Sequence, residues 1–169
     1  AQAAKQVIIQ GIREAERGLI YEEFTSKEHE ILTGVVTHVE PRNGAVSIRI
    51  SSNSEFTEAM LPLNERVRGE ELPEGDRIKV YVVEVKNATR GPQVMISRTH
   101  PGLVKRLFEQ EVAEIAKGTV EIRSIAREPG SRTKIAVHST DVLIDPVGAC
   151  VGQRGGRVDR VVTELKGEK

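Results

Sequence analysis

The sequence lacks the features that mark membrane, secreted and disulfide-bonded proteins. No apolar run in its 169 residues is long enough to cross a bilayer, and no signal-peptide pattern is present. Cys150 is the single cysteine, so an internal disulfide is excluded, which fits a reducing cytoplasm. These absences predict a soluble, cytoplasmic protein with no membrane partner.

Aromatic residues and net charge are also scarce. Aromatics make up 3% of the chain, Trp is absent, and the formal net charge is zero. The sequence therefore has no global positive field and few rings on which bases would stack. Residues 1–100 carry 13 Lys and Arg against 15 Asp and Glu, whereas residues 101–169 carry 12 against 10. Attraction to a polyanion has to be local, and the C-terminal part is where we expect it.

A Gly-x-x-Gly loop, Gly152-Gln153-Arg154-Gly155, is the most informative motif present. It stands between a small-residue helical pattern and a second helix whose apolar positions repeat at helical spacing: Val158, Val161, Val162 and Leu165. Glycines let a backbone approach a partner closely, and the start of a helix suits a phosphate. A plain turn between helices is the alternative interpretation of the motif alone.

The chemistry around this loop favours a nucleic-acid backbone as its ligand. Arg154, Arg157 and Arg160 place three positive charges within seven residues, against the one acid Asp159. The pattern is neither a phosphate-binding Walker loop nor a dinucleotide fingerprint. A KH domain uses the same order of helix, loop and helix to clamp single-stranded RNA or DNA.

The earlier part of the chain divides into a helix and a run of short strands. Residues 1–24 have helical periodicity, and we expect a connector helix packed on the next domain. Period-two patterns then predict five strands, which suggest a small closed β-barrel. The predicted strands are residues 31–40, 45–50, 56–61, 77–85 and 93–98.

The later part predicts a compact mixed unit. A helix over residues 99–117 is followed by strands at 119–127 and 133–139, and then by a short helix that Asp145 and Pro146 begin. The loop and the last helix come next. The expected fold class is therefore mixed α/β and multidomain, with a barrel followed by an α+β domain.

Two parts of the chain, the predicted barrel and the predicted α+β unit, resemble known RNA-binding domains. Thr33–Val36, Pro73–Val80 and Val94–Arg98 are similar to the OB-fold domain first named in the largest small-subunit ribosomal protein. That family usually has an aromatic residue before the small residues of its second strand, where this chain reads Arg42-Asn43-Gly44-Ala45 and the nearest aromatic is Phe56. We therefore expect an auxiliary RNA-binding or structural role for the barrel. The helix, strand, strand, helix, loop and helix order resembles the prokaryotic, type II KH domain.

The whole chain resembles the NusA family of bacterial transcription factors. Three segments carry the resemblance: the predicted helix of residues 1–24, the junction Ser97–Phe108 and the segment Ile125–Val137. It implies three parts: a connector helix (1–28) that closes an absent N-terminal domain, an OB-fold barrel (29–100), and a first KH domain (101–169) that stops before its final strand. We therefore expect the chain to be a piece of a longer protein.

The resemblance also implies a function. It indicates a non-enzymatic RNA-binding elongation factor that acts in transcription pausing, termination and antitermination on single-stranded nascent RNA. The implied partners are RNA polymerase and other antitermination proteins, with no cofactor and no small-molecule substrate. The alternative is an RNA-binding accessory region of a ribonuclease or of a ribosome-associated factor.

The predicted RNA-binding residues follow the KH pattern. Gly152 and Gly155 would admit the RNA backbone while Gln153 and Arg154 project beside it. Arg157 is expected to contact phosphates. The strand Thr133–Val137 would form the other wall of the groove, with Ile135 and Val151 as its apolar floor. Arg132 and Lys134 would either reach the strand's edge of that groove or keep the strand soluble.

An enzyme is the rival class. Cys150 and His138 would be the nucleophile and base. However, Cys150 stands in a small-residue apolar helix, where a buried inert thiol is usual. The four histidines have no metal-ligand spacing, so neither a catalytic nor a metal site is predicted.

Overall fold

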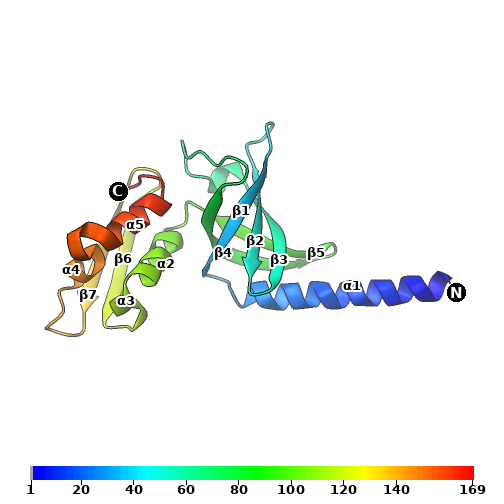
Figure 1. Cartoon of the computed structure of the whole chain (residues 1–169), viewed down its shortest axis with the longest axis horizontal. Helices are drawn as coiled ribbons and strands as arrows, with labels where there is room; N and C mark the ends of the chain where they lie inside the picture. The colour runs from blue at the N-terminus through cyan, green and yellow to red at the C-terminus, as the bar shows by residue number, and fades with distance from the viewer. Residues whose placement is uncertain (1) are drawn as a thin grey trace. The chain divides into compact units, whose positions relative to one another are not determined.

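The structure is a computed structural model that describes residues 2–169; Ala1, the first residue of the predicted connector helix, lies outside them. The chain forms two compact units. The first contains the chain up to Leu63 together with Pro73–Ile96, and the second contains Asn64–Leu72 together with Ser97–Lys169. Figure 1 shows the helix and barrel of the first unit and the mixed helix and strand arrangement of the second. The predicted boundaries at residues 28 and 100 stay a prediction.

A long helix, α1 (Gln2–Thr25), begins the first unit. Its C-terminal end packs against the barrel, where Phe24 is fully buried. The predicted apolar stripe does not pack on the barrel, because Val7, Ile8, Ile12 and Leu19 are all more than half exposed. The expected connector helix thus packs on the next domain through its C-terminal end rather than through this stripe.

Five antiparallel strands form the barrel: β1 (Ile31–Val39), β2 (Val46–Ser52), β3 (Glu55–Leu61), β4 (Arg77–Ala88) and β5 (Gly91–Ser97). Their hydrogen-bonded order is β3-β2-β1-β4-β5. All five predicted strands are thus confirmed, and the sheet curls into a nearly closed barrel (Figure 1). Period-two alternation places one face of each strand inside, and Ile48, Ile50 and Val80 are fully buried there.

The chain between β3 and β4 leaves the barrel unit. A short 3₁₀ turn, η1 (Leu63–Glu65), begins it. The main-chain N–H of Arg98 donates to the carbonyl of Glu65, and Val67 and Leu72 are buried. The segment Asn64–Leu72 therefore belongs to the core of the second unit, although barrel strands flank it in sequence.

The predicted helix over residues 99–117 is divided in two. His100 caps α2 (Pro101–Glu111), because its Nδ1 accepts a hydrogen bond from the N–H of Gly102 at 2.9 Å. Val112 then adopts an extended conformation before α3 (Ala113–Ala116). A continuous helix would turn Gln110, Glu111 and Glu114 toward the face of Leu103 and Leu107. The break changes the phase, so that Val112 and Ile115 are buried instead.

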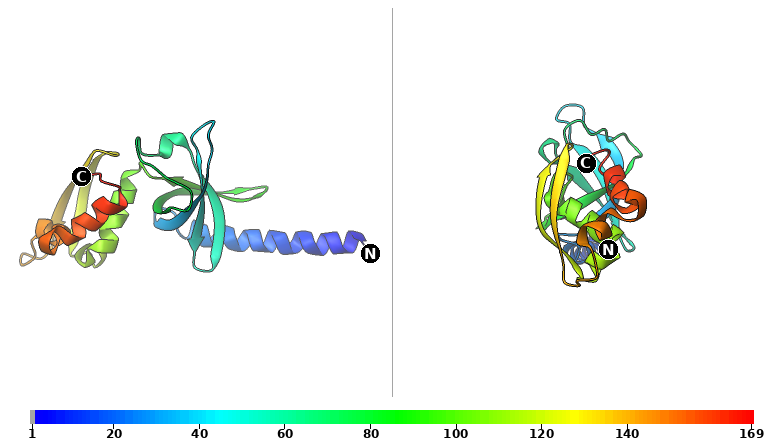
Figure 2. Two further views of the ribbon diagram at one scale, coloured as in Figure 1. Left: turned by 45° about the horizontal axis from the view of Figure 1, so that its top comes forward. Right: turned by 90° about the vertical axis from the view of Figure 1, so that its left-hand side faces the viewer.

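The second unit contains a two-stranded antiparallel sheet, β6 (Val120–Glu128) and β7 (Arg132–Ser139). Helices α2 and α5 (Gly156–Glu164) lie on the same face of this sheet, as Figure 2 shows. At the edge of β7, the N–H of Thr133 donates to the carbonyl of Lys169, and the N–H of Lys169 donates to that of Ser131. Lys169 therefore pairs with β7 in the pattern of a parallel strand.

A helix, a turn and a second helix carry the Gly-x-x-Gly motif: α4 (Pro146–Val151), η2 (Gln153–Gly155) and α5. Asp145 caps α4 through a hydrogen bond from the N–H of Val147 to its carboxylate, which confirms its predicted capping position. The expected class is confirmed: a connector helix, a five-stranded OB-type barrel and a KH-type α+β unit. No helix formed by residues 2–169 combines the length and apolar character that a membrane crossing requires.

Candidate nucleic-acid interface

The Gly-x-x-Gly loop is held in a conformation that needs its glycines. Gly152 has φ +77° and Gly155 has φ +75°, in the left-handed region that L-residues rarely adopt. A Cβ on Gly152 would approach Cγ of Arg157 to 2.7 Å. The loop therefore needs glycine at position 152 for both its dihedral angle and its space.

Arg154 shares this unusual backbone conformation although it is not a glycine. Its φ is +55° and its ψ is +28°, and its side chain is exposed at the tip of the loop. A left-handed conformation costs an L-residue about 1–2 kcal/mol. Strained backbone positions cluster at functional sites, so this conformation of an exposed arginine is consistent with the prediction that Arg154 belongs to the binding site.

The start of α5 is open to a ligand. Gly155 is its N-cap residue and provides no side-chain cap for the first N–H groups of the helix. These groups and the positive end of the helix dipole lie directly behind the loop. The arrangement suits an anion, such as a phosphate, that approaches the loop from solvent.

Arg157, a predicted RNA contact, is already engaged inside the protein. Its Nη1 donates hydrogen bonds to the carboxylate of Glu114 and to the carbonyl of Ala149, both at 2.7 Å. The main-chain N–H of Glu114, followed by Arg157, holds the pKa of that carboxyl below its ordinary value. Arg157 thus ties α4 and α5 to α3, and the structure gives it a supporting position behind the loop.

An apolar hollow of about 180 Å³ lies between β7 and the helices that flank the loop. Ile135 and Val151, the predicted floor of the groove, both line it. Alternation along β7 directs Thr133, Ile135 and Val137 toward the hollow. The remaining lining residues are Phe108, Ile122, Val147, Cys150 and Val158.

A second, polar hollow lies at the loop itself. Three of the predicted RNA-binding residues line it: Gly152, Gln153 and Arg157. Three residues outside the predicted set complete it: Gly148, Gly156 and Arg160. A polar hollow at a glycine loop and an apolar hollow on the neighbouring strand suit the backbone and the bases of one single strand, respectively.

Arg132 and Lys134 do not join the loop residues. Both are exposed, and they alternate with Thr133 and Ile135, so their side chains leave the opposite face of β7. The alternation of side chains along the strand, which is visible in the sequence, was sufficient to place Arg132 and Lys134 on the opposite face from Ile135. The helical spacing of Val147 and Val151 was likewise sufficient to find Val147 as a further lining residue.

Cys150 and His138, the pair considered for an enzyme, do not face each other. Cys150 lines the apolar hollow beside Val137, whereas His138 points from the exposed face of β7. Burial raises the pKa of the Cys150 thiol, so the nucleophilic thiolate is disfavoured. No cluster of metal-binding side chains occurs in residues 2–169.

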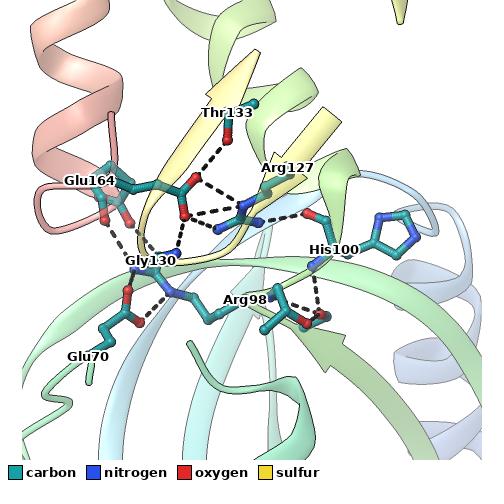
Figure 3. Close-up of polar contacts among 10 residues, drawn as sticks. Glu70, Arg98, His100, Arg127, Gly130, Thr133 and Glu164 are labelled. Carbon is teal, nitrogen blue, oxygen red and sulfur yellow. Dashed lines mark hydrogen bonds and ion pairs between the residues drawn. The ribbon is translucent and has the colours of Figure 1, made fainter. Parts of the chain in front are cut away.

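A buried network of ion pairs and hydrogen bonds connects β6, β7 and the end of α5 (Figure 3). Arg127 donates to both carboxylate oxygens of Glu168 at 3.0 Å and to the carbonyl of His100 at 2.9 Å. Glu168 also accepts hydrogen bonds from the N–H of Gly130 and the hydroxyl of Thr133. Arg98 forms a second cluster with Glu70 and Glu164. These contacts fix β6, β7 and the end of α5 in one unit.

Comparison with known proteins identifies the second unit. Residues 98–169 match the family described as "NusA-like first KH domain". The chain is 53% identical over all 169 residues to the transcription termination/antitermination protein NusA of Halalkalibacterium halodurans, and it covers 43% of that protein. The corresponding protein of Bacillus subtilis is also 53% identical, with 44% of its length covered.

The chain belongs to the NusA family. A more distant relative, the NusA protein of Thermus thermophilus, is 45% identical over 168 residues, and 42% of its length is covered. The chain thus spans less than half the length of the curated NusA proteins it matches. These relatives are named as transcription proteins rather than as enzymes.

Proposed function

We propose that this chain is the part of a bacterial transcription elongation factor that binds single-stranded nascent RNA during pausing, termination and antitermination. The arrangement that supports the proposal is the strained loop at Arg154 with an uncapped helix start behind it and an apolar hollow beside it. Family membership supports the process, since the relatives are named for termination and antitermination. Cytoplasmic action beside RNA polymerase and other antitermination proteins, without catalysis, belongs to the same proposal.

The residues of the site have different proposed roles. Gly152 and Gly155 admit the RNA backbone, and Gln153 and Arg154 contact its phosphates from the loop. Ile135 and Val151 form the surface against which bases pack. Arg157 holds the loop through Glu114 and Ala149, while Arg132 and Lys134 contribute long-range attraction from the other face of β7.

We further propose the predicted division into a connector helix (1–28), an OB-fold barrel (29–100) and a KH domain (101–169). The segment Asn64–Leu72 contributes to the KH unit from within the barrel sequence. Removal of that segment should therefore destabilise the KH unit, although it lies outside the KH part of the chain.

Fluorescence anisotropy with a labelled single-stranded RNA tests the RNA site. The double variant Gln153→Asp with Arg154→Asp should lose most binding and keep the wild-type melting curve. Each phosphate contact contributes roughly −0.7 to the slope of log affinity against log salt for single strands. The slope should therefore become shallower in this variant.

A matched control carries the same change of charge on residues that line neither hollow. Lys105→Asp with Gln93→Asp meets this requirement, because both positions are exposed. Equal loss of binding in the control and in the loop variant would show that net charge rather than the loop decides affinity. Unchanged binding in the loop variant would contradict the site.

A further inference from the structure

The loop that joins β7 to α4 (Figure 1) presents two almost fully exposed apolar side chains. Val142 is 99% exposed and Leu143 is 90% exposed. No other large apolar side chain in residues 2–169 reaches these values, and the next, Val7, is 72% exposed. One exposed apolar residue is ordinary, but two in succession on a loop indicate a contact with another molecule. We call Val142 and Leu143 the apolar tip.

Hydrogen bonds hold the apolar tip in one conformation. Oγ of Ser139 accepts a hydrogen bond from the N–H of Asp141 at 3.1 Å and donates one to its carbonyl at 2.7 Å. The carboxylate of Asp141 accepts one from the N–H of Leu143 at 2.9 Å. The N–H and the hydroxyl of Thr140 both donate to the carbonyl of Thr119, next to β6. A loop that is already ordered loses little entropy when it binds.

Two acids flank the apolar tip. Asp141 and Asp145 are both exposed, and each carboxylate accepts a hydrogen bond from a nearby main-chain N–H. No Lys or Arg occurs between Lys134 and Arg154. The negative charges repel an RNA backbone, so RNA is a poor ligand for the tip. They are complementary to an apolar surface that is edged with cations.

The apolar hollow of the second unit is a surface of that kind. It has a volume of about 180 Å³, and Ile135 and Val151 line it. Val151 directly precedes the Gly-x-x-Gly loop, where the Arg154 side chain is exposed. Arg160 lies beside the same loop, and its side chain contacts Glu111 at 3.3 Å but is still 68% exposed. The hollow therefore combines an apolar floor with two exposed cations.

The tip and the hollow of one chain are neighbouring surfaces, but the tip does not fill the hollow. Neither Val142 nor Leu143 lines the hollow, whereas Val147, in the first turn of α4, does. Because the two surfaces adjoin, a two-fold axis can bring the tip of each copy to the hollow of the other. An interface of so few side chains is expected to be weak and reversible.

We propose that this chain forms a two-fold dimer in which the apolar tip of each copy occupies the apolar hollow of the other. The acids of each tip then face Arg154 and Arg160 of the second copy. The hollow is also the proposed surface for RNA bases, so the dimer and the RNA complex exclude each other. This exclusion rests on the proposed RNA-binding function, whereas dimerisation does not.

Sedimentation equilibrium of the whole chain tests dimerisation. The wild-type chain should show a reversible monomer–dimer equilibrium that added salt shifts toward the monomer, since opposite charges meet in the contact. Leu143→Ser should weaken it about 10- to 150-fold for each of the two contacts, the range that corresponds to burial of one Leu side chain. Met60→Ser is the matched control, because Met60 is 53% exposed on the barrel. A monomeric wild-type chain, or equal weakening by the two variants, would overturn the dimer.

A disulfide between two copies tests where the tip lies. Cys150 lines the hollow and is the single cysteine of the chain. A copy with Leu143→Cys and Cys150→Ser is mixed with the wild-type chain and a mild oxidant, at alkaline pH because burial raises the pKa of the Cys150 thiol. The thiol introduced at position 143 should become linked to Cys150 of the wild-type copy, as mass spectrometry of the joined peptides would identify.

The control for this experiment is a copy with Met60→Cys and Cys150→Ser, which should give only background linkage. Equal linkage from positions 60 and 143 would overturn insertion of the tip into the hollow.

RNA binding separates this inference from the proposed function. Excess single-stranded RNA should dissociate the wild-type dimer, and Leu143→Ser should bind RNA at least as tightly as the wild type. A chain that binds RNA but stays monomeric overturns the dimer alone. A chain that dimerises through Leu143 but binds no RNA overturns the proposed function alone. A dimer that keeps its association with RNA bound overturns the exclusion.

Discussion

The guanidinium of Arg98 donates two hydrogen bonds to the carboxylate of Glu70, from Nε to Oε1 at 2.9 Å and from Nη2 to Oε2 at 2.7 Å (Figure 3). The Arg98 side chain is fully buried and that of Glu70 is 3% exposed. Arg98 also contacts Glu164 near the end of α5. The pair therefore connects Asn64–Leu72, an insertion between two barrel strands, to the rest of the second unit, which contains the proposed RNA site.

Replacement of Glu70 should destabilise the second unit. Glu70→Ala removes the carboxylate that accepts two hydrogen bonds from a buried guanidinium, and loss of one partner of a buried pair costs about 3–5 kcal/mol. Chemical unfolding followed by circular dichroism measures the loss. The double variant Glu70→Leu with Arg98→Met should recover much of it, because neither member of the buried pair then keeps a charge without its partner. A Glu70→Ala variant as stable as the wild type would contradict the role of this pair.

Glu168 should make stability depend on pH in the acid range. Burial raises the pKa of its carboxyl, but hydrogen bonds from Arg127, Gly130 and Thr133 outweigh this effect and leave the pKa below the ordinary 4.5. The ionised group therefore contributes stability above about pH 4.5, and the contribution is lost as the pH falls through the lower folded value.

The variant Glu168→Gln tests this dependence. At pH 7 it should be less stable than the wild type by about 3–5 kcal/mol, since Arg127 keeps a buried charge without its partner. The difference should narrow as the pH is lowered below 4.5. Melting curves at several pH values measure both effects, and a difference that is constant with pH would contradict the assignment.

Arg154 should show opposite effects on stability and on binding. Arg154→Gly removes the left-handed strain of an L-residue, which is worth about 1–2 kcal/mol, so the melting temperature should not fall. RNA affinity should decrease, and the salt slope should become shallower by about 0.7, because one phosphate contact is lost. Arg154→Lys provides the comparison, since it keeps the charge. Equal affinity of the glycine and lysine variants would exclude a phosphate contact by this residue.

Arg157 should affect the fold more than the salt dependence. Arg157→Ala loses the hydrogen bonds to Glu114 and Ala149, and charged hydrogen bonds contribute about 1.5–3 kcal/mol each. We expect lower stability of the loop, seen as faster amide exchange in α4, and weaker RNA binding with an unchanged salt slope. A shallower slope at unchanged stability would restore Arg157 to direct phosphate contact.

Local patterns predicted most of the elements. Period-two alternation gave the five barrel strands, and glycines with a periodic helix gave the Gly-x-x-Gly loop, because backbone preference and side-chain direction depend on near neighbours. The same reasoning failed for residues 99–117, where helical spacing predicted one helix. The extended Val112 divides it, since burial of Val112 and Ile115 requires a change of phase that only packing against the sheet selects.

The sequence by itself determined the order of the elements and the chemistry of the loop. Tertiary structure decided which arginines are available: Arg157 is bound to Glu114 across 43 residues, whereas Arg154 is exposed. It also joined Glu70 to Arg98 and placed Arg49 over Phe56. These pairings depend on strand register and chain topology, which bring together charges and rings that are distant in sequence and have no local signal.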